Sequence, residues 1–127
     1  MSAADQLPDV VRAFILRHID SVAELEGLLL VRSSETQEWN ISSLASRLYI
    51  READARVVLH ALHRRGLLSL DGETFTYAPA SDALRVEVDA LAAAYPRFLI
   101  PITNIVHGKP HASVRDFADA FRLREEK

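Results

Sequence analysis

The sequence predicts a mainly α-helical protein with one small β-hairpin, which places it in the α+β class. Apolar residues recur at three- and four-residue spacing along most of the chain, the period of helices that bury one side. Two short β-type runs, "LLSL" and "ETFTYA", flank Asp71-Gly72, and Asp-Gly is a strong hairpin signal. With 127 residues, nearly half of them apolar, the chain suits one compact domain plus an extension.

Two helices are predicted before residue 35. Pro8 suits a first helical position, where its missing N–H would have no partner anyway, and a helix is expected over residues 8–18. Ser21 and Glu24 form a capping box at the start of the next helix, and Gly27 lies inside that helix at some cost to its stability. The apolar faces of the two helices are traced by Val11, Phe14, Ile15 and His18, and by Val22, Leu25, Leu28, Leu29 and Arg32.

The middle of the chain predicts a short strand, two helices and the hairpin. Trp39 is expected to form a one-residue strand, and Asn40 can cap the helix that follows. After a tight turn at Tyr49–Ile50, a helix is predicted over residues 52–65, with Gly66 just past its end. The hairpin is predicted to turn at Asp71-Gly72, both with positive φ as in a type I′ turn. The apolar face of the first helix is Ile41, Leu44, Ala45 and Leu48.

This order of elements resembles the winged helix-turn-helix superfamily, which includes many small dimeric bacterial transcription regulators. The resemblance covers about residues 21–78 and rests on "WNISSLASRLYI", "LHALHRRGLL" and the Asp-Gly hairpin. It implies a winged helix-turn-helix domain with an N-terminal helix over residues 1–80, and a helical extension over residues 81–127. It also implies that the helix over residues 52–65 enters the major groove of DNA.

The outward side of that helix supplies candidate DNA contacts. If Ala55, Val58, Leu59 and Leu62 face the core, the opposite stripe is Ala53, Val57, His60 and Arg64. Arginine binds guanine edges and phosphate, and small hydroxyls at a helix start can hold phosphates. The predicted DNA-binding residues are Ser42, Ser43, Arg51, Arg56, His60 and Arg64.

The charges on this part of the chain favour a second hypothesis as well. The net charge is −3, and residues 39–78 hold five arginines against four acids. Asp71 and Glu73 at the hairpin tip would repel phosphates, and affinity for the DNA backbone comes mainly from cations. Glu52 and Asp54 either disfavour DNA as well or complement the dipole at the helix start. The first hypothesis is therefore a homodimeric DNA-binding transcription regulator, and the alternative is an adaptor that binds a protein partner through Ala53, Val57 or the C-terminal helix.

After the hairpin the sequence carries a heptad-like apolar seam. Ser81 is an expected N-cap, and Pro96 and Pro101 predict either one kinked helix or two helices with a break near Pro96. The seam indicates a dimerisation helix, and the alternative is that it packs on the chain's own core. Its residues, at spacings of four and three, are Leu84, Val88, Leu91, Tyr95, Phe98, Ile102 and Ile105.

The C-terminal segment predicts one more amphipathic helix. Ser113 and Asp116 resemble another capping box. The helix is expected to fold back on the domain or to cross to a second subunit. Its apolar face is Val114, Phe117, Ala118 and Phe121.

The sequence lacks the motifs of an enzyme or a cofactor site. It has no cysteine and no nucleophile elbow, phosphate-binding loop or dinucleotide fingerprint. The pairs His60–His63 and His107–His111 lack further ligands, so no metal site is predicted. No secretory signal and no apolar run near 20 residues is present, so we expect a cytoplasmic protein without catalytic residues, cofactor or membrane partner.

Overall fold

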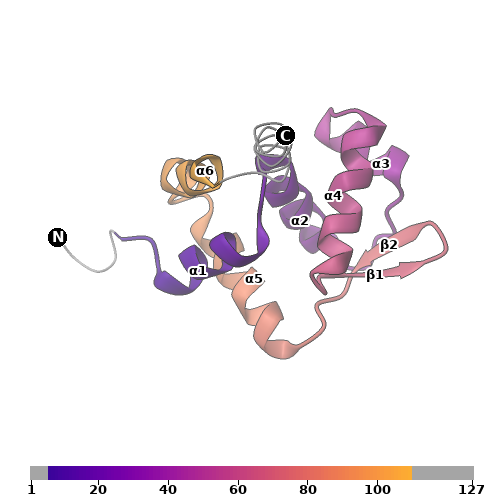
Figure 1. Cartoon of the computed structure of the whole chain (residues 1–127). Helices are drawn as coiled ribbons and strands as arrows, with labels where there is room; N and C mark the ends of the chain where they lie inside the picture. The colour runs from indigo at the N-terminus through magenta and orange to yellow at the C-terminus, as the bar shows by residue number, and fades with distance from the viewer. Residues whose placement is uncertain (1–5, 110–127) are drawn as a thin grey trace, which may run out of the picture.

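The structure, a computed structural model, describes residues 6–109. These residues form six helices and one two-stranded antiparallel sheet, so the predicted mainly helical α+β class is confirmed (Figure 1). In this part of the chain, no helix combines the length and the apolar character needed to cross a bilayer. The elements are α1 (Asp9–His18), α2 (Val22–Ser33), α3 (Ile41–Leu48), α4 (Glu52–Arg64), β1 (Leu68–Asp71), β2 (Thr74–Tyr77), α5 (Asp82–Ala94) and α6 (Leu99–Gly108).

One hydrophobic core joins the two parts that the sequence analysis separated near residue 80. Helix α1 packs against α5 and α6, while α4 packs against α2, α3 and β1 (Figure 1). Helix α2 also contacts α6 and β2, which ties the two ends together. The fully buried residues of the core come from both parts and include Val11, Phe14, Leu25, Leu28, Leu44, Leu59, Leu62, Val88, Leu91, Ile102 and Val106.

The predicted Ser21 and Ser81 caps are present, but the Glu24 carboxylate bonds the Asp20 N–H and not the Ser21 N–H of a capping box. Pro8 is the N-cap of α1, not its first helical residue. The Ser21 hydroxyl accepts from the Glu24 backbone N–H at 3.1 Å, and the Glu24 carboxylate accepts from the Asp20 N–H at 3.4 Å. Ser81 caps α5 in the same way, accepting from the Leu84 N–H at 3.1 Å. Such local bonds satisfy N–H groups that a helix start leaves without partners, so they can be recognised from short sequence patterns.

Gly27 allows α2 and α4 to approach closely. A Cβ atom at this position would lie 2.8 Å from Cγ1 of Val58 on α4. That separation is too short for two carbon atoms, so a larger residue here would force Val58 or the helix backbone to shift. The cost of glycine inside a helix is therefore offset by the packing of α2 on α4.

The turn between α3 and α4 contains a strained residue that is not glycine. Tyr49 has φ 58 in the left-handed region, and its side chain is 94% exposed. The Ile50 N–H reaches back to the Ala45 carbonyl at 3.1 Å, a bond typical of a helix that ends on a left-handed residue. At the end of α4 the left-handed residue is Gly66, with φ 78, as predicted.

The hairpin turns one residue later than predicted. Asp71 pairs with Thr74, so the two-residue loop is Gly72-Glu73 and not Asp71-Gly72. Gly72 has φ 64, and Glu73 is not among the described residues with positive φ, which corrects the type I′ prediction. A positive φ at the first loop residue alone is the pattern of a type II′ turn, which requires one glycine. Trp39 forms the predicted one-residue strand, an antiparallel bridge to Phe75.

The apolar seam is divided between two helices and packs within the chain. The chain leaves α5 after Ala94 and starts α6 at Leu99, which is the second of the two predicted outcomes. Val88, Leu91 and Ile102 are fully buried in the chain's own core. Leu84, Tyr95, Phe98 and Ile105 are partly buried against the same core. Within residues 6–109 the seam therefore packs on the chain's own core, which is the alternative to the predicted dimerisation helix. The C-terminal helix predicted after Ser113 lies outside the described residues.

A cluster of charges around Asp20 joins the ends of α1, α4 and α6. The Asp20 carboxylate lies 2.7 Å from Nη2 of Arg65 and 3.1 Å from Nζ of Lys109. Lys109 also donates to the carbonyls of Ile15 and Ile19, and Arg65 donates to the carbonyl of Arg17. Cations at the carbonyl end of a helix stabilise its dipole, so this cluster holds three helix ends together.

Glu24 is the buried acid in the described part of the chain, and its protonation should affect stability. Burial raises the pKa of the Glu24 carboxyl above its ordinary 4.5, although the Asp20 N–H bond opposes the shift. A carboxyl whose pKa is raised by folding stabilises the folded state below the unfolded pKa. That contribution is lost as pH rises through the folded pKa.

We therefore expect Glu24→Gln to unfold at higher urea concentration than the parent chain at neutral pH. The gain should vanish as pH falls below 4.5, the ordinary glutamate value. Urea titrations at several pH values measure this difference. Glu26→Gln, on the exposed side of the same helix, is the control. A gain independent of pH would contradict the proposed cause.

Candidate nucleic-acid interface

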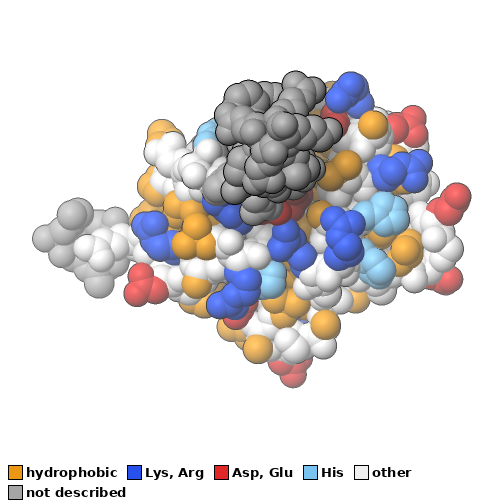
Figure 2. Space-filling view, in the orientation of Figure 1, with side chains coloured by type: hydrophobic (Ala, Val, Ile, Leu, Met, Phe, Trp, Pro, Cys, Tyr) orange, Lys and Arg blue, Asp and Glu red, His pale blue; other side chains and the backbone are white. Residues whose placement is uncertain are grey.

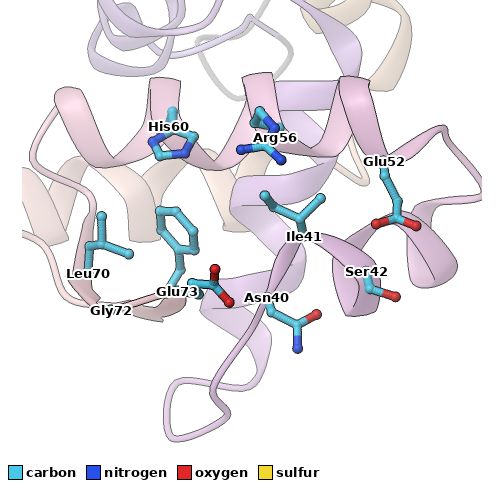
Figure 3. Close-up of a pocket in the computed structure, with 10 residues that line it drawn as sticks. Asn40, Ile41, Ser42, Glu52, Arg56, His60, Leu70, Gly72 and Glu73 are labelled. Atoms are coloured by element: carbon cyan, nitrogen blue, oxygen red, sulfur yellow. The ribbon is translucent and has the colours of Figure 1, made fainter.

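A groove lies between the exposed side of α4, the start of α3 and the hairpin (Figure 3). We call it the α4–hairpin groove, and its volume is about 520 Å³. Arg56 and His60 extend from α4 along one wall, and Glu73 enters from the hairpin (Figure 3). The lining residues are Asn40, Ile41, Ser42, Glu52, Arg56, His60, Leu70, Gly72, Glu73 and Phe75.

Arg56 and His60 are the groove residues best placed to contact a ligand. Arg56 is exposed and forms no ion pair with any residue between 6 and 109. His60 lies one turn further along α4 and is half-buried, with its ring edge-on to Phe75 at 5.3 Å. The guanidinium is therefore available for bidentate hydrogen bonds, while the imidazole packs against Phe75.

Arg51 is held by a carboxylate of its own helix turn. Its Nε lies 3.2 Å from Oδ2 of Asp54 and its Nη2 lies 3.5 Å from Oδ1. The arginine side chain is 83% exposed, so the pair is weak and open to competition by an anion. Arg51 lies outside the α4–hairpin groove. Of the two arginines predicted to contact bases, only Arg56 lines this groove.

The two predicted phosphate-binding serines have different surroundings. Ser43 is used in the cap of α3: its hydroxyl accepts from the Asn40 N–H at 2.9 Å and donates to the Asn40 carbonyl at 3.0 Å. Ser42 is exposed and lines the groove. Only Ser42 therefore has a hydroxyl free of the capping bonds.

The crest of α4 separates this groove from a second one. The predicted inward residues Ala55, Val58, Leu59 and Leu62 are all buried, so the orientation of α4 is confirmed. Val57 is 61% exposed, and Ala53 and Arg64 are exposed beside it. On the other side of this crest lies a groove of about 540 Å³, here called the α2–α4 groove. Its lining is Asp20, Ser21, Ala23, Glu24, Ile50, Asp54, Val57, Val58, Ala61, Arg64 and Arg65.

The charge on this side of the molecule is mixed. Figure 2 shows basic and histidine side chains over α4, with acidic side chains toward the outer edge of the α3 and hairpin region. Within the α4–hairpin groove, one arginine faces the two acids Glu52 and Glu73. A phosphate backbone placed here would meet both signs, so few phosphate contacts are available and the salt dependence of binding should be shallow.

Sequence reasoning missed some residues that shape the groove. Asn40, predicted only as a helix cap, also lines it. Leu70 and Glu73 line it from the hairpin. The alternation of β1, where Leu68 is buried and Leu70 exposed, was a usable signal for Leu70. No sequence pattern could show that Glu73 enters the groove, because this depends on the turn register.

The paired histidines of α4 serve packing in the described structure. His60 and His63 both lie edge-on to the Phe75 ring, His63 at 6.3 Å. Within residues 6–109, no group of three or more His, Asp or Glu side chains is arranged to hold a metal ion.

No family model, curated protein or solved structure matches this chain in comparisons with known proteins.

Proposed function

We propose that the chain is a winged-helix transcription regulator that binds duplex DNA through α4. The observation that carries the proposal is Arg56, exposed and without an ion pair to residues 6–109, on the open side of a two-helix turn beside a hairpin. Arginine at such a position can bind a guanine edge with two hydrogen bonds. A helix crest with Ala53 and Val57 also offers apolar contact to thymine methyl groups.

The remaining contacts in the proposal are secondary. Ser42 would donate to a phosphate at the edge of the groove, and His60 and Arg64, one and two turns further along α4, would contact the duplex beyond Arg56. Arg51 would contribute to DNA binding only if a phosphate replaced Asp54 as its ion-pair partner. The acidic Glu73 keeps the hairpin tip off the phosphates, so the affinity depends mainly on α4.

Pairing of two copies belongs to the same proposal, since twofold sites on DNA suit twofold dimers. The interface would lie outside the seam, whose central residues are buried in the core. Exposed apolar side chains on α1 and α6 offer another surface: Val10, Leu16, Leu99 and Ile100.

We expect Arg56→Ala to weaken DNA binding about tenfold or more, the loss typical of one bidentate base contact. Fluorescence anisotropy on labelled duplex fragments, from low to physiological salt, measures the change. Arg12→Ala, exposed on α1 away from the groove, should bind like the parent chain. Equal affinity of both variants, or no binding to any duplex at low salt, would contradict the proposal.

One observation favours a second candidate, a protein-binding adaptor. Tyr49 is 94% exposed in the turn before α4, and exposed tyrosines are common anchors of protein interfaces. If no duplex binds, affinity capture with parent and Tyr49→Ser chains separates this candidate. A partner retained equally by both chains would show that Tyr49 is not its contact.

A further inference from the structure

The α2–α4 groove has an apolar floor and charged edges. Val58 and Ala61 are buried at its base, while Ala23 and Ile50 are half-buried on its sides. Val57 stands at its rim, 61% exposed. Apolar side chains therefore form the floor and sides of this groove, and Val57 leaves apolar surface exposed at its rim that a partner segment can cover.

The side chain of the last described residue reaches the edge of this groove. Lys109, the last residue described, lies 3.1 Å through Nζ from Asp20, and Asp20 lines the groove. Its ammonium also binds two carbonyls at the end of α1, so the position of the chain at Lys109 is held. Residues 110–127 follow directly from this point.

The sequence after Lys109 has the right pattern for such a groove. Val114, Phe117 and Phe121 are spaced to share one side of a helix, and Ser113 can cap it. The four residues before Val114 can span roughly 13 Å when extended. A helix this short is only marginally stable when isolated in water. Burial of the two phenylalanines would add the stabilisation that the isolated helix lacks.

We propose that residues 113–121 dock in the α2–α4 groove of their own chain, with Phe117 and Phe121 against Val58 and Ala61. The segment then covers Val57 and Arg64, which line this groove, so that the DNA contacts left open are those of the α4–hairpin groove, Arg56 above all. This docking does not depend on the chain binding DNA.

The absence of cysteine from the chain allows a direct test by chemical cross-linking. Cysteines are placed in the groove and in the tail of the full chain, as Ala23→Cys with Ala118→Cys. A short bis-maleimide then links thiols that lie close together, without requiring a particular register. A second pair, Val57→Cys with Ala118→Cys, covers the case in which Ala23→Cys disturbs folding, because Val57 is exposed.

We expect both pairs to form a cross-link within one chain, seen by mass spectrometry. A pair with Ser69→Cys on the exposed side of β1 and Ala118→Cys is the control and should link poorly. Adding Phe117→Ser and Phe121→Ser should abolish the groove cross-links. Linkage no better than the control, linkage that survives both serine changes, or a covalent dimer would overturn docking in the same chain.

Discussion

Leu91→Ala is expected to lower the free energy of unfolding by about 2–5 kcal/mol, the usual cost of truncating a fully buried leucine. Leu91 is 0% exposed and lies in the core that α5 and α6 share with α1. The cost combines lost burial of apolar surface with the cavity left in packing that relaxes only partly. Urea unfolding followed by the fluorescence of Trp39, which is itself buried, measures it.

The matched control is Val86→Ala on the same helix. Val86 is 63% exposed, so its truncation should change the free energy of unfolding by no more than about 0.5 kcal/mol. The experiment also shows whether Leu91 is buried in the core of one chain or in an interface between two subunits. If the loss at Leu91 depended on protein concentration, or if the two variants were equally stable, the assignment of the seam to the chain's own core would be wrong.

Asp20→Ala is expected to cost about 2–3 kcal/mol, because it leaves two partly buried cations without their carboxylate. The Lys109 side chain is only 11% exposed and that of Arg65 is 25% exposed, so water replaces the lost partner poorly. The effect should include looser attachment of the end of α6, since Lys109 binds both Asp20 and α1. Urea unfolding measures the loss, and hydrogen exchange at the ends of α1 and α6 locates it.

Asp89→Ala provides the comparison for this prediction. Asp89 pairs with Arg32 between α5 and α2 at 3.0 Å, but the two side chains are 47% and 32% exposed. Exposed pairs contribute at most about 1 kcal/mol, so this variant should be clearly more stable than Asp20→Ala. Similar losses in the two variants would show that burial of the Asp20 cluster contributes little.

Local signals in the sequence predicted most of the elements. Ser21, Asn40 and Ser81 each cap a helix in the structure, and Gly66 follows the end of α4 with positive φ. These signals succeed because each depends on bonds within a few residues. The predicted position of the hairpin turn was wrong by one residue. The Asp-Gly pair is compatible with a type I′ and with a type II′ turn, and the choice between them depends on strand register.

The candidate interface was predicted less completely. The apolar period of residues 52–65 was enough to orient α4, so Arg56, His60 and Arg64 were expected on its open side, where the structure places them. Periodicity could not show that Asp54 holds Arg51 or that Ser43 is used in a cap. Those pairings depend on side-chain rotamers and on competing partners nearby.

The sequence by itself determined the helices, their caps and which side of each is apolar, since hydrogen bonds within a turn and hydrophobic periodicity are local properties. Only the tertiary structure decided what covers each apolar side. Apolar residues at spacings of four and three are compatible with a coiled coil and with a helix that packs on its own chain. In the structure α5 and α6 contact α1, and Val88, Leu91 and Ile102 are buried in the chain's own core. The tertiary structure also decided which charges pair, because the partner of Lys109 lies 89 positions away at Asp20.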